Sequence, residues 1–104
     1  MKYKVFEFGD VVGEFIVEGD SMRMKLKPGF SSDAMAFLYD EEGNVSSQNI
    51  QIWLAERIFP PTRVDVSVML GKLGLTEYSQ IDILRAYKGR GDSDTLWIDF
   101  DNPF

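Results

Sequence analysis

Carboxylates are the side chains of this sequence that could build a functional site. The 104 residues include 17 Asp and Glu against 11 Lys and Arg, a formal net charge of −6, and they include no His and no Cys. The missing imidazole and thiol groups exclude His-based acid–base catalysis, Cys nucleophiles, disulfides and Cys/His zinc sites. Because a net negative protein repels phosphates, we expect a partner protein with a basic surface, and neither direct nucleic-acid contact nor a membrane.

The acidic residues gather in two stretches of the chain. Within residues 31–60 five acidic groups accompany a single base, Arg57, and no basic residue occurs after position 91. Charge runs of this kind are usually solvated turns. Carboxylates can also stand in for phosphates against the Lys and Arg of a partner, where they speed association. The residues predicted to bind a partner are Asp40, Glu41, Glu42, Asp92, Asp94, Asp99 and Asp101.

Other chemistry has weaker signals in the sequence. Asp92, Asp94 and Asp99 could ligate a hard cation, but their spacing does not match a calcium loop. The run at 88–92 places two glycines among cations, yet it lacks the Gly-Lys-Ser/Thr ending of a phosphate-binding loop, and a helix cap followed by a loop explains it. We therefore expect a protein that is not an enzyme and holds no metal or cofactor.

Alternation of apolar and polar residues predicts three strands at the start of the chain. Stretches 3–8 and 11–18 flank a Gly-Asp turn at positions 9 and 10, where Gly tolerates a positive φ. The third stretch alternates strictly, with Met22, Met24 and Leu26 on the inner face. We expect an antiparallel meander with one solvated face, whose exposed edge strand could pair with a second copy to make a homodimer.

Helical spacing and a closing apolar segment complete the expected fold. We expect a helix capped by Ser46 or Ser47 and running to about Arg57, a helix starting at Thr62 or Asp65 and ending at Gly74, and a helix capped by Ser79 and ending at Gly89. Residues 95–100 predict a buried strand, and 34–39 suit either a helix or a strand. The result is a single α+β domain, residues 1–104: a three-stranded antiparallel meander, three short helices and a C-terminal strand returning to the sheet.

The sequence also predicts the cellular location of the protein and the environment of its two tryptophans. The first residues are too charged for a signal peptide, and no apolar run approaches the roughly 20 residues of a membrane span, so we expect a cytoplasmic protein. Trp53 and Trp97 are expected in the core, with an interface role as the alternative.

The second and third predicted helices could instead form a DNA-binding helix-turn-helix. Arg85, Lys88 and Arg90 would then face phosphates. The recognition helix would begin with Gln80 and Asp82, and the acidic side chain there opposes the approach of the DNA backbone. A DNA-binding regulator is therefore an alternative rather than the leading hypothesis.

One segment resembles a known group of proteins. The sequence WLAERIFPPTR at 53–63, followed by Leu-Gly-Leu at 73–75 and Asp-Thr-Leu-Trp-Ile at 94–98, resembles the C-terminal part of small Gram-positive bacterial proteins found beside, or fused to, HipA-type kinases. The resemblance implies a regulatory partner of such a kinase, with 53–63 as its interface. A structural explanation is also available, in which Arg57 and Arg63 reach carboxylates or helix carbonyls and fix the angle between two helices.

In its general type the chain is similar to anti-CRISPR inhibitors of bacterial mobile elements, which are small, acidic, single-domain proteins that block a guided nuclease. The leading hypothesis is a non-enzymatic acidic binding protein, a nucleic-acid mimic that inhibits a nucleic-acid-binding partner. The regulator of a HipA-type kinase and the helix-turn-helix protein are the alternatives.

Overall fold

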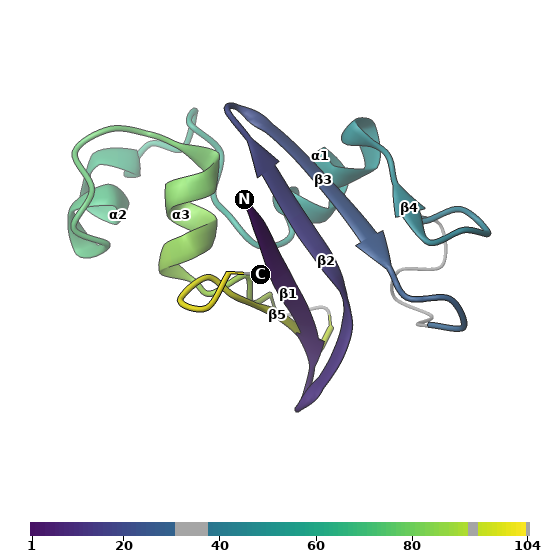
Figure 1. Ribbon diagram of the computed structural model, residues 1–104. Helices are drawn as coiled ribbons and strands as arrows, with labels where there is room; N and C mark the ends of the chain where they lie inside the picture. Colours follow the sequence, from purple (N-terminus) through teal and green to yellow (C-terminus); the bar gives the residue numbers. More distant parts are fainter. Residues whose placement is uncertain (31–37, 92–93, 104) are drawn as a thin grey trace.

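Five strands form one antiparallel sheet in the part of the chain that the computed structural model describes, residues 1–30, 38–91 and 94–103 (Figure 1). The strands are β1 (Lys2–Glu7), β2 (Asp10–Glu18), β3 (Ser21–Leu26), β4 (Asn44–Val45) and β5 (Leu96–Asp99). Their order across the sheet is β4-β3-β2-β1-β5, so the meander lies in the middle and the last strand returns to pair with the first. The expected α+β fold, with its N-terminal meander and returning strand, is confirmed.

The β1–β2 turn differs by one residue from the prediction. Glu7 pairs with Asp10, so the two turn residues are Phe8 and Gly9, and Phe8 rather than Gly9 has the positive φ, +54°. The reason is a bulge in the ladder: the register shifts between Val5 and Phe6. A bulge moves the pairing of everything that follows it, and the alternation pattern of the sequence gives no sign of this one.

Three helices follow the meander, at or close to the predicted positions. They are α1 (Ser47–Ala55), α2 (Val66–Lys72) and α3 (Gln80–Ala86). The predicted serine caps of α1 and α3 are confirmed, since the hydroxyl oxygens of Ser46 and Ser79 accept hydrogen bonds from backbone N–H groups three residues ahead. No helix in the described ranges has the length and apolar character needed to cross a bilayer.

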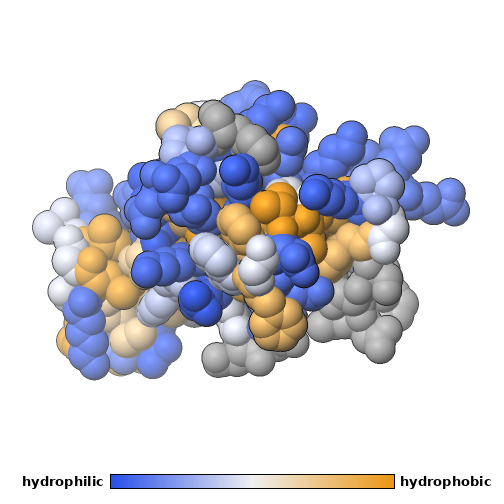
Figure 2. Space-filling model, turned by 60° about the horizontal axis from the view of Figure 1, so that its bottom comes forward, coloured by the Kyte–Doolittle hydropathy of each residue, from blue (hydrophilic) through white to orange (hydrophobic). Residues whose placement is uncertain are grey.

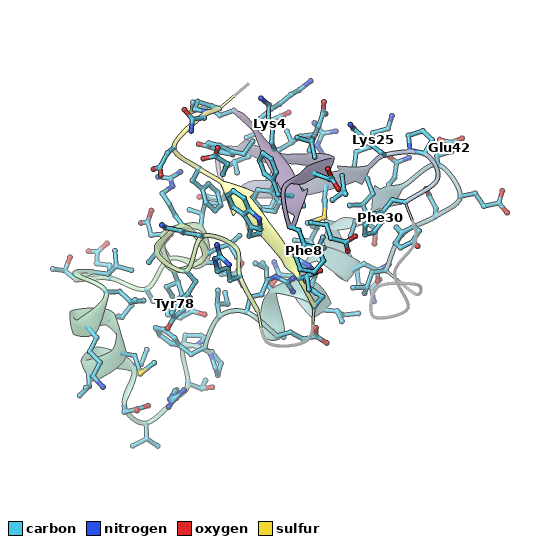
Figure 3. All side chains as sticks on the ribbon, turned by 90° about the horizontal axis from the view of Figure 1, so that it is seen from below. Lys4, Phe8, Lys25, Phe30, Glu42 and Tyr78 are labelled. Atoms are coloured by element: carbon cyan, nitrogen blue, oxygen red, sulfur yellow. The ribbon has the colours of Figure 1, made fainter. Side chains whose placement is uncertain are left out.

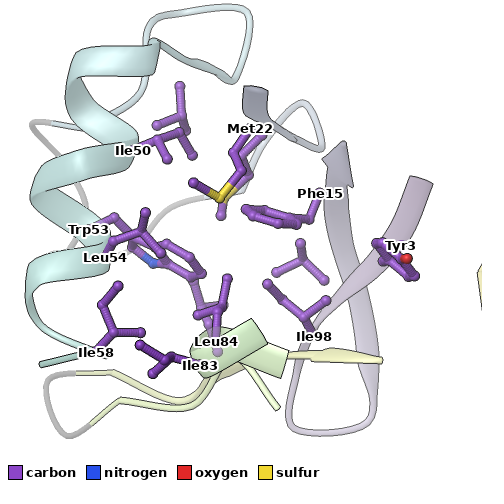
Figure 4. Close-up of a cluster of buried hydrophobic side chains, with 14 of the residues drawn as sticks. Tyr3, Phe15, Met22, Ile50, Trp53, Leu54, Ile58, Ile83, Leu84 and Ile98 are labelled. Atoms are coloured by element: carbon purple, nitrogen blue, oxygen red, sulfur yellow. The ribbon is translucent and has the colours of Figure 1, made fainter. Parts of the chain in front are cut away.

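The hydrophobic core lies between the sheet and helices α1 and α3 (Figure 4). Met22, Met24 and Leu26 are all buried, as the alternation of the third strand predicted. Helix α1 contributes Ile50, Trp53 and Leu54, and α3 contributes Ile83 and Leu84. Helix α2 buries only Leu70, so it adds less to the core than the other two helices.

The two tryptophans lie on opposite faces of the sheet. Trp53 is fully buried, as expected for a core residue. The core prediction for Trp97 is wrong: Trp97 is half-buried and stacks on Phe6 of the neighbouring strand, with ring centroids 4.5 Å apart. In β5 it is Leu96 and Ile98 that face the core, so the period of two places Trp97 on the outer face. Residues 95–100 were expected to be a buried strand, but β5 is an edge strand with one buried face.

Both outer strands of the meander are paired along part of their length. Strand β1 pairs with β5 through four residues, whereas β3 pairs with β4 only at Met24 and Lys25, so the edge on which the homodimer expectation was based is partly occupied. The outer edge of β5 is also covered, because the Ile98 N–H donates to the Lys88 carbonyl and the Leu96 N–H donates to Asp94. On the other side Tyr39 bridges Val45; residues 34–37 of the ambiguous segment lie outside the described ranges.

Tyr78 anchors the segment between α2 and α3. Its hydroxyl donates to the Phe59 carbonyl at 2.6 Å, and its ring packs edge-on against the Phe59 ring. Burial raises the pKa of the Tyr78 phenol above its ordinary value. The neutral phenol is therefore the form that the fold favours, and ionisation must weaken the folded state.

A substitution at Gly43 should cost more stability than one at Gly19. Both residues have a left-handed backbone, with φ of +88° and +60°, where a side chain costs roughly 1–2 kcal/mol. A Cβ at Gly43 would in addition lie 2.2 Å from the Leu26 carbonyl oxygen, whereas a Cβ at Gly19 meets nothing within 4 Å. Urea unfolding of Gly43→Ala and Gly19→Ala measures the difference, and equal losses would contradict the close approach.

Ionisation of Tyr78 should lower the stability of the folded protein in alkaline solution. Because the folded-state pKa is raised, its contribution is complete below the unfolded pKa and is lost as pH rises through the folded pKa. The difference in phenolate absorbance between the wild type and Tyr78→Phe isolates this titration, and we expect its midpoint above the ordinary tyrosine value. A midpoint at the ordinary value would show that burial does not act on this hydroxyl.

Candidate functional site

The first acidic cluster forms a well-ordered turn that leads into β4. One carboxylate oxygen of Asp40 accepts hydrogen bonds from the backbone N–H groups of Glu42 and Asn44, each at 2.9 Å. The Asp40 N–H also donates to the Asn44 carbonyl at 3.0 Å, and the Leu26 N–H donates to the Gly43 carbonyl at 2.8 Å. We call residues 40–44 the acidic turn; its shape is fixed by the Asp40 side chain and by the end of β3.

Two carboxylates of the acidic turn remain available to a partner. Glu41 and Glu42 are exposed, and Figure 3 shows Glu42 at the side of the molecule away from Tyr78. The ion pairs among the described residues join Arg23 to Glu18, Arg57 to Asp94 and Arg63 to Asp65. Within these ranges, therefore, neither Glu41 nor Glu42 forms an ion pair.

The second acidic cluster is at the opposite edge of the sheet. Asp99 lies on β5 and Asp101 just after it, whereas the acidic turn adjoins β4. Four strand spacings of about 4.8 Å separate the two edges, about 19 Å in all. Asp99 is half-buried and accepts hydrogen bonds from the Asp101 backbone and the Asn102 side chain, while Asp101 is exposed. The fold thus does not bring the two predicted clusters together, and Asp92 lies outside the described ranges.

The outer face of the sheet between these edges is mixed in charge. In register across β5, β1, β2 and β3, Asp99, Lys4, Glu14 and Lys25 lie side by side, so that acidic and basic residues alternate. Figure 2 shows hydrophobic residues gathered near the middle of the face in view, with hydrophilic residues around them. The exposed acidic surface that the sequence predicted is therefore limited to separate corners, of which the acidic turn holds the most carboxylates.

Asp94 has an internal role, and its assignment to a partner-binding surface is corrected. Its side chain is only 6% exposed and forms an ion pair with Arg57, whose side chain is fully buried. The same carboxylate oxygen accepts the Leu96 N–H at 2.9 Å. A partner cannot reach this charge without breaking a buried ion pair, which is one of the more costly changes in a folded protein.

Arg57 joins three segments that are far apart in the sequence. It follows α1, its guanidinium stacks over the Trp53 ring at 4.0 Å, and its Nε donates to the Gly89 carbonyl at 2.9 Å just beyond α3. Its Nη2 forms an ion pair with Asp94, which lies just before β5. As expected, Arg57 and Arg63 each reach a carboxylate, but Arg63 pairs locally with Asp65, and their hydrogen bond lowers the pKa of that carboxyl.

About half of the 53–63 segment is unavailable as an interface. Trp53, Leu54 and residues 57–59 are buried, whereas Ala55, Glu56 and residues 60–63 are exposed. Packing within the fold thus accounts for the buried residues of this segment, and the exposed residues are open to solvent. Comparisons with protein-family models, curated proteins and solved structures found no match, so the resemblance rests on the quoted residues alone.

The helix pair is also engaged within the fold. The side-chain amides of Gln80 and Gln51 exchange hydrogen bonds, which ties the start of α3 to α1. In a helix-turn-helix this is the end of the helix that contacts bases. Arg85 lies over the Phe100 ring and Arg90 over the Trp97 ring, so these cations do not follow a single helix face.

A metal site built from carboxylates would need several of them to converge. Among the described residues, no three acidic side chains come together in an arrangement that could hold a metal ion. The sequence reasoning correctly singled out Arg57 as a cross-link but could not identify its partner, because Asp94 is 37 residues away and lies among several equivalent acidic residues.

Arg57 and Arg63 should differ sharply in their effect on stability. Arg57→Met leaves Asp94 buried without its counter-ion and is expected to cost about 3–5 kcal/mol. Arg63→Met removes an exposed pair and should cost less than about 1 kcal/mol. Denaturant unfolding measures both variants. Adding Asp94→Asn to Arg57→Met should recover part of the loss, and similar losses for the two single variants would contradict the structural role of Arg57.

Proposed function

We propose that this protein is a non-enzymatic binding protein that docks its acidic turn on a basic, nucleic-acid-binding surface of a partner protein. The most concrete version is an inhibitor of a guided nuclease, acting where guide or target phosphates would bind. Inhibition would follow from occupancy, because carboxylates that contact the lysines and arginines of such a groove exclude the nucleic acid from it.

The observation that supports this proposal is the set of hydrogen bonds that holds an exposed acidic turn in place. Glu41 and Glu42 lie in a loop whose backbone is hydrogen-bonded to the Asp40 side chain and to the end of β3. The backbone of this loop therefore loses little conformational freedom when a partner binds. A merely solvating charge run needs no such internal order. The turn lies beside the start of α1, and Glu42 is at the side of the molecule away from Tyr78 (Figure 3).

Each carboxylate of the acidic turn can contribute only a little to binding affinity, because it is exposed to solvent. Exposed charge pairs add little to affinity but increase the association rate, and this effect falls with salt because the Debye length is about 8 Å at physiological ionic strength. The acidic turn and Asp101 are at opposite edges of the sheet, so we assign the primary contact to the acidic turn alone. Binding that depends on Asp101 would require a partner surface that spans the sheet.

Neutralising the acidic turn should slow the onset of inhibition of the partner. The measurement is cleavage of target DNA by a panel of purified, guide-loaded and guide-free bacterial nucleases, with the wild type and with Glu41→Gln/Glu42→Gln. We expect the wild type to inhibit at least one nuclease at low salt, and the double variant to lose about tenfold or more in association rate.

The matched control is Asp20→Asn/Glu77→Gln, which removes the same two charges from exposed positions outside the acidic turn. This control should inhibit like the wild type. Equal weakening by both double variants would assign the effect to net charge, and binding that is unchanged by salt would contradict an electrostatic contact. A protein that inhibits none of the nucleases would refute the concrete version.

A further inference from the structure

Three arginines from different parts of the chain line one hollow on the side of the molecule that carries α2. Arg57 follows α1, Arg63 precedes α2 and Arg90 follows α3, and the hollow between them has a volume of about 460 Å³. Ile58, Phe59 and Met69 supply its apolar lining. A volume of several hundred Å³, an apolar wall and a few convergent polar groups are the usual features of a small-molecule site.

A buried donor at this hollow has no acceptor among the described residues. The side chain of Arg57 is completely buried, and within the described ranges its Nη1 makes no hydrogen bond, whereas its Nε and Nη2 have the Gly89 carbonyl and Asp94. Gly91, which also lines the hollow, lies against this nitrogen: a Cβ at position 91 would be 3.3 Å from Nη1. Buried arginine N–H groups are normally satisfied, so this one points to an acceptor that none of the described residues supplies.

The other two arginines can complete an oxyanion site. Arg63 is exposed and shares its charge with Asp65 through one nitrogen, Nε. Arg90 is exposed, and among the described residues no carboxylate forms an ion pair with it. Glu56 is the single acidic residue among those that line the hollow. The planar fork of an arginine matches the oxygens of a carboxylate or a phosphate, and such charge-assisted hydrogen bonds are the stronger ones.

We propose that this hollow binds a small organic molecule that carries a carboxylate or phosphate group. The oxyanion accepts hydrogen bonds from Arg63 and Arg90 and supplies the missing acceptor of Arg57, while the apolar part of the molecule packs against Phe59 and Met69. This site is independent of the acidic turn, with which it shares no residue, and it would give the protein a ligand of its own.

Phenyl phosphate, benzoate, inorganic phosphate and benzyl alcohol are the probes that separate these contributions. Each is titrated into isotope-labelled protein at constant ionic strength, and the Gly91 amide and the Arg57 Nε–H are followed by NMR. We expect saturable shifts with phenyl phosphate or benzoate, weaker binding of inorganic phosphate, which lacks the apolar part, and none with benzyl alcohol, which lacks the charge. The two charged aromatic probes distinguish a phosphate from a carboxylate ligand.

Arg63→Gln/Arg90→Gln should weaken binding of the better probe by about tenfold or more, because both lost groups make charge-assisted hydrogen bonds. The matched control is Arg23→Gln, an exposed arginine on β3 that should leave the affinity within about twofold. Both altered arginines are exposed, and amide spectra confirm the fold of each variant. Shifts that stay linear in probe concentration, or saturable binding that the double variant does not weaken, would overturn the proposal.

Discussion

The buried ion pair of Arg57 and Asp94 is the interaction on which the arrangement of this fold depends most. One guanidinium packs against Trp53, holds the backbone beyond α3 at Gly89 and meets the carboxylate that starts β5. Helices α1 and α3 and the last strand are thus positioned relative to one another by a single side chain. A buried charge tolerates only the geometry in which its partners are present, so the pair selects one packing of these elements even where it adds little net stability.

Much of the fold was predictable because its signals are local. The strict alternation at Met22, Met24 and Leu26 and the serine caps at Ser46 and Ser79 each act within a few residues, and each was found as expected. The pairing of β1 with β5 is not local, and neither is the choice of face for Trp97. Its propensity makes a tryptophan in an apolar strand a core candidate. In β5, however, Leu96 and Ile98 face the core, and because side chains of a strand alternate between its two faces, Trp97 lies on the outer face.

The candidate site was less predictable for the same reason. Seven acidic residues form two groups in the sequence, yet the fold separates the acidic turn from Asp101 by the width of the sheet and turns Asp94 inward. Charge runs describe composition along the chain, whereas an electrostatic surface depends on which edges and turns the topology brings together. The arginines at 57, 63 and 90 show the converse, since three residues that are spread over the sequence line one hollow.

The return of the chain to β1 also has a consequence for its synthesis. The indole of Trp97 donates to the Phe8 carbonyl across a separation of 89 residues, and β5 covers an edge of β1 that no earlier strand of the sheet covers. While the polypeptide is still emerging from the ribosome, the meander therefore exposes an unpaired strand to other nascent chains. Contacts of such long sequence separation also form slowly, so the sheet closes only after translation has passed its last strand.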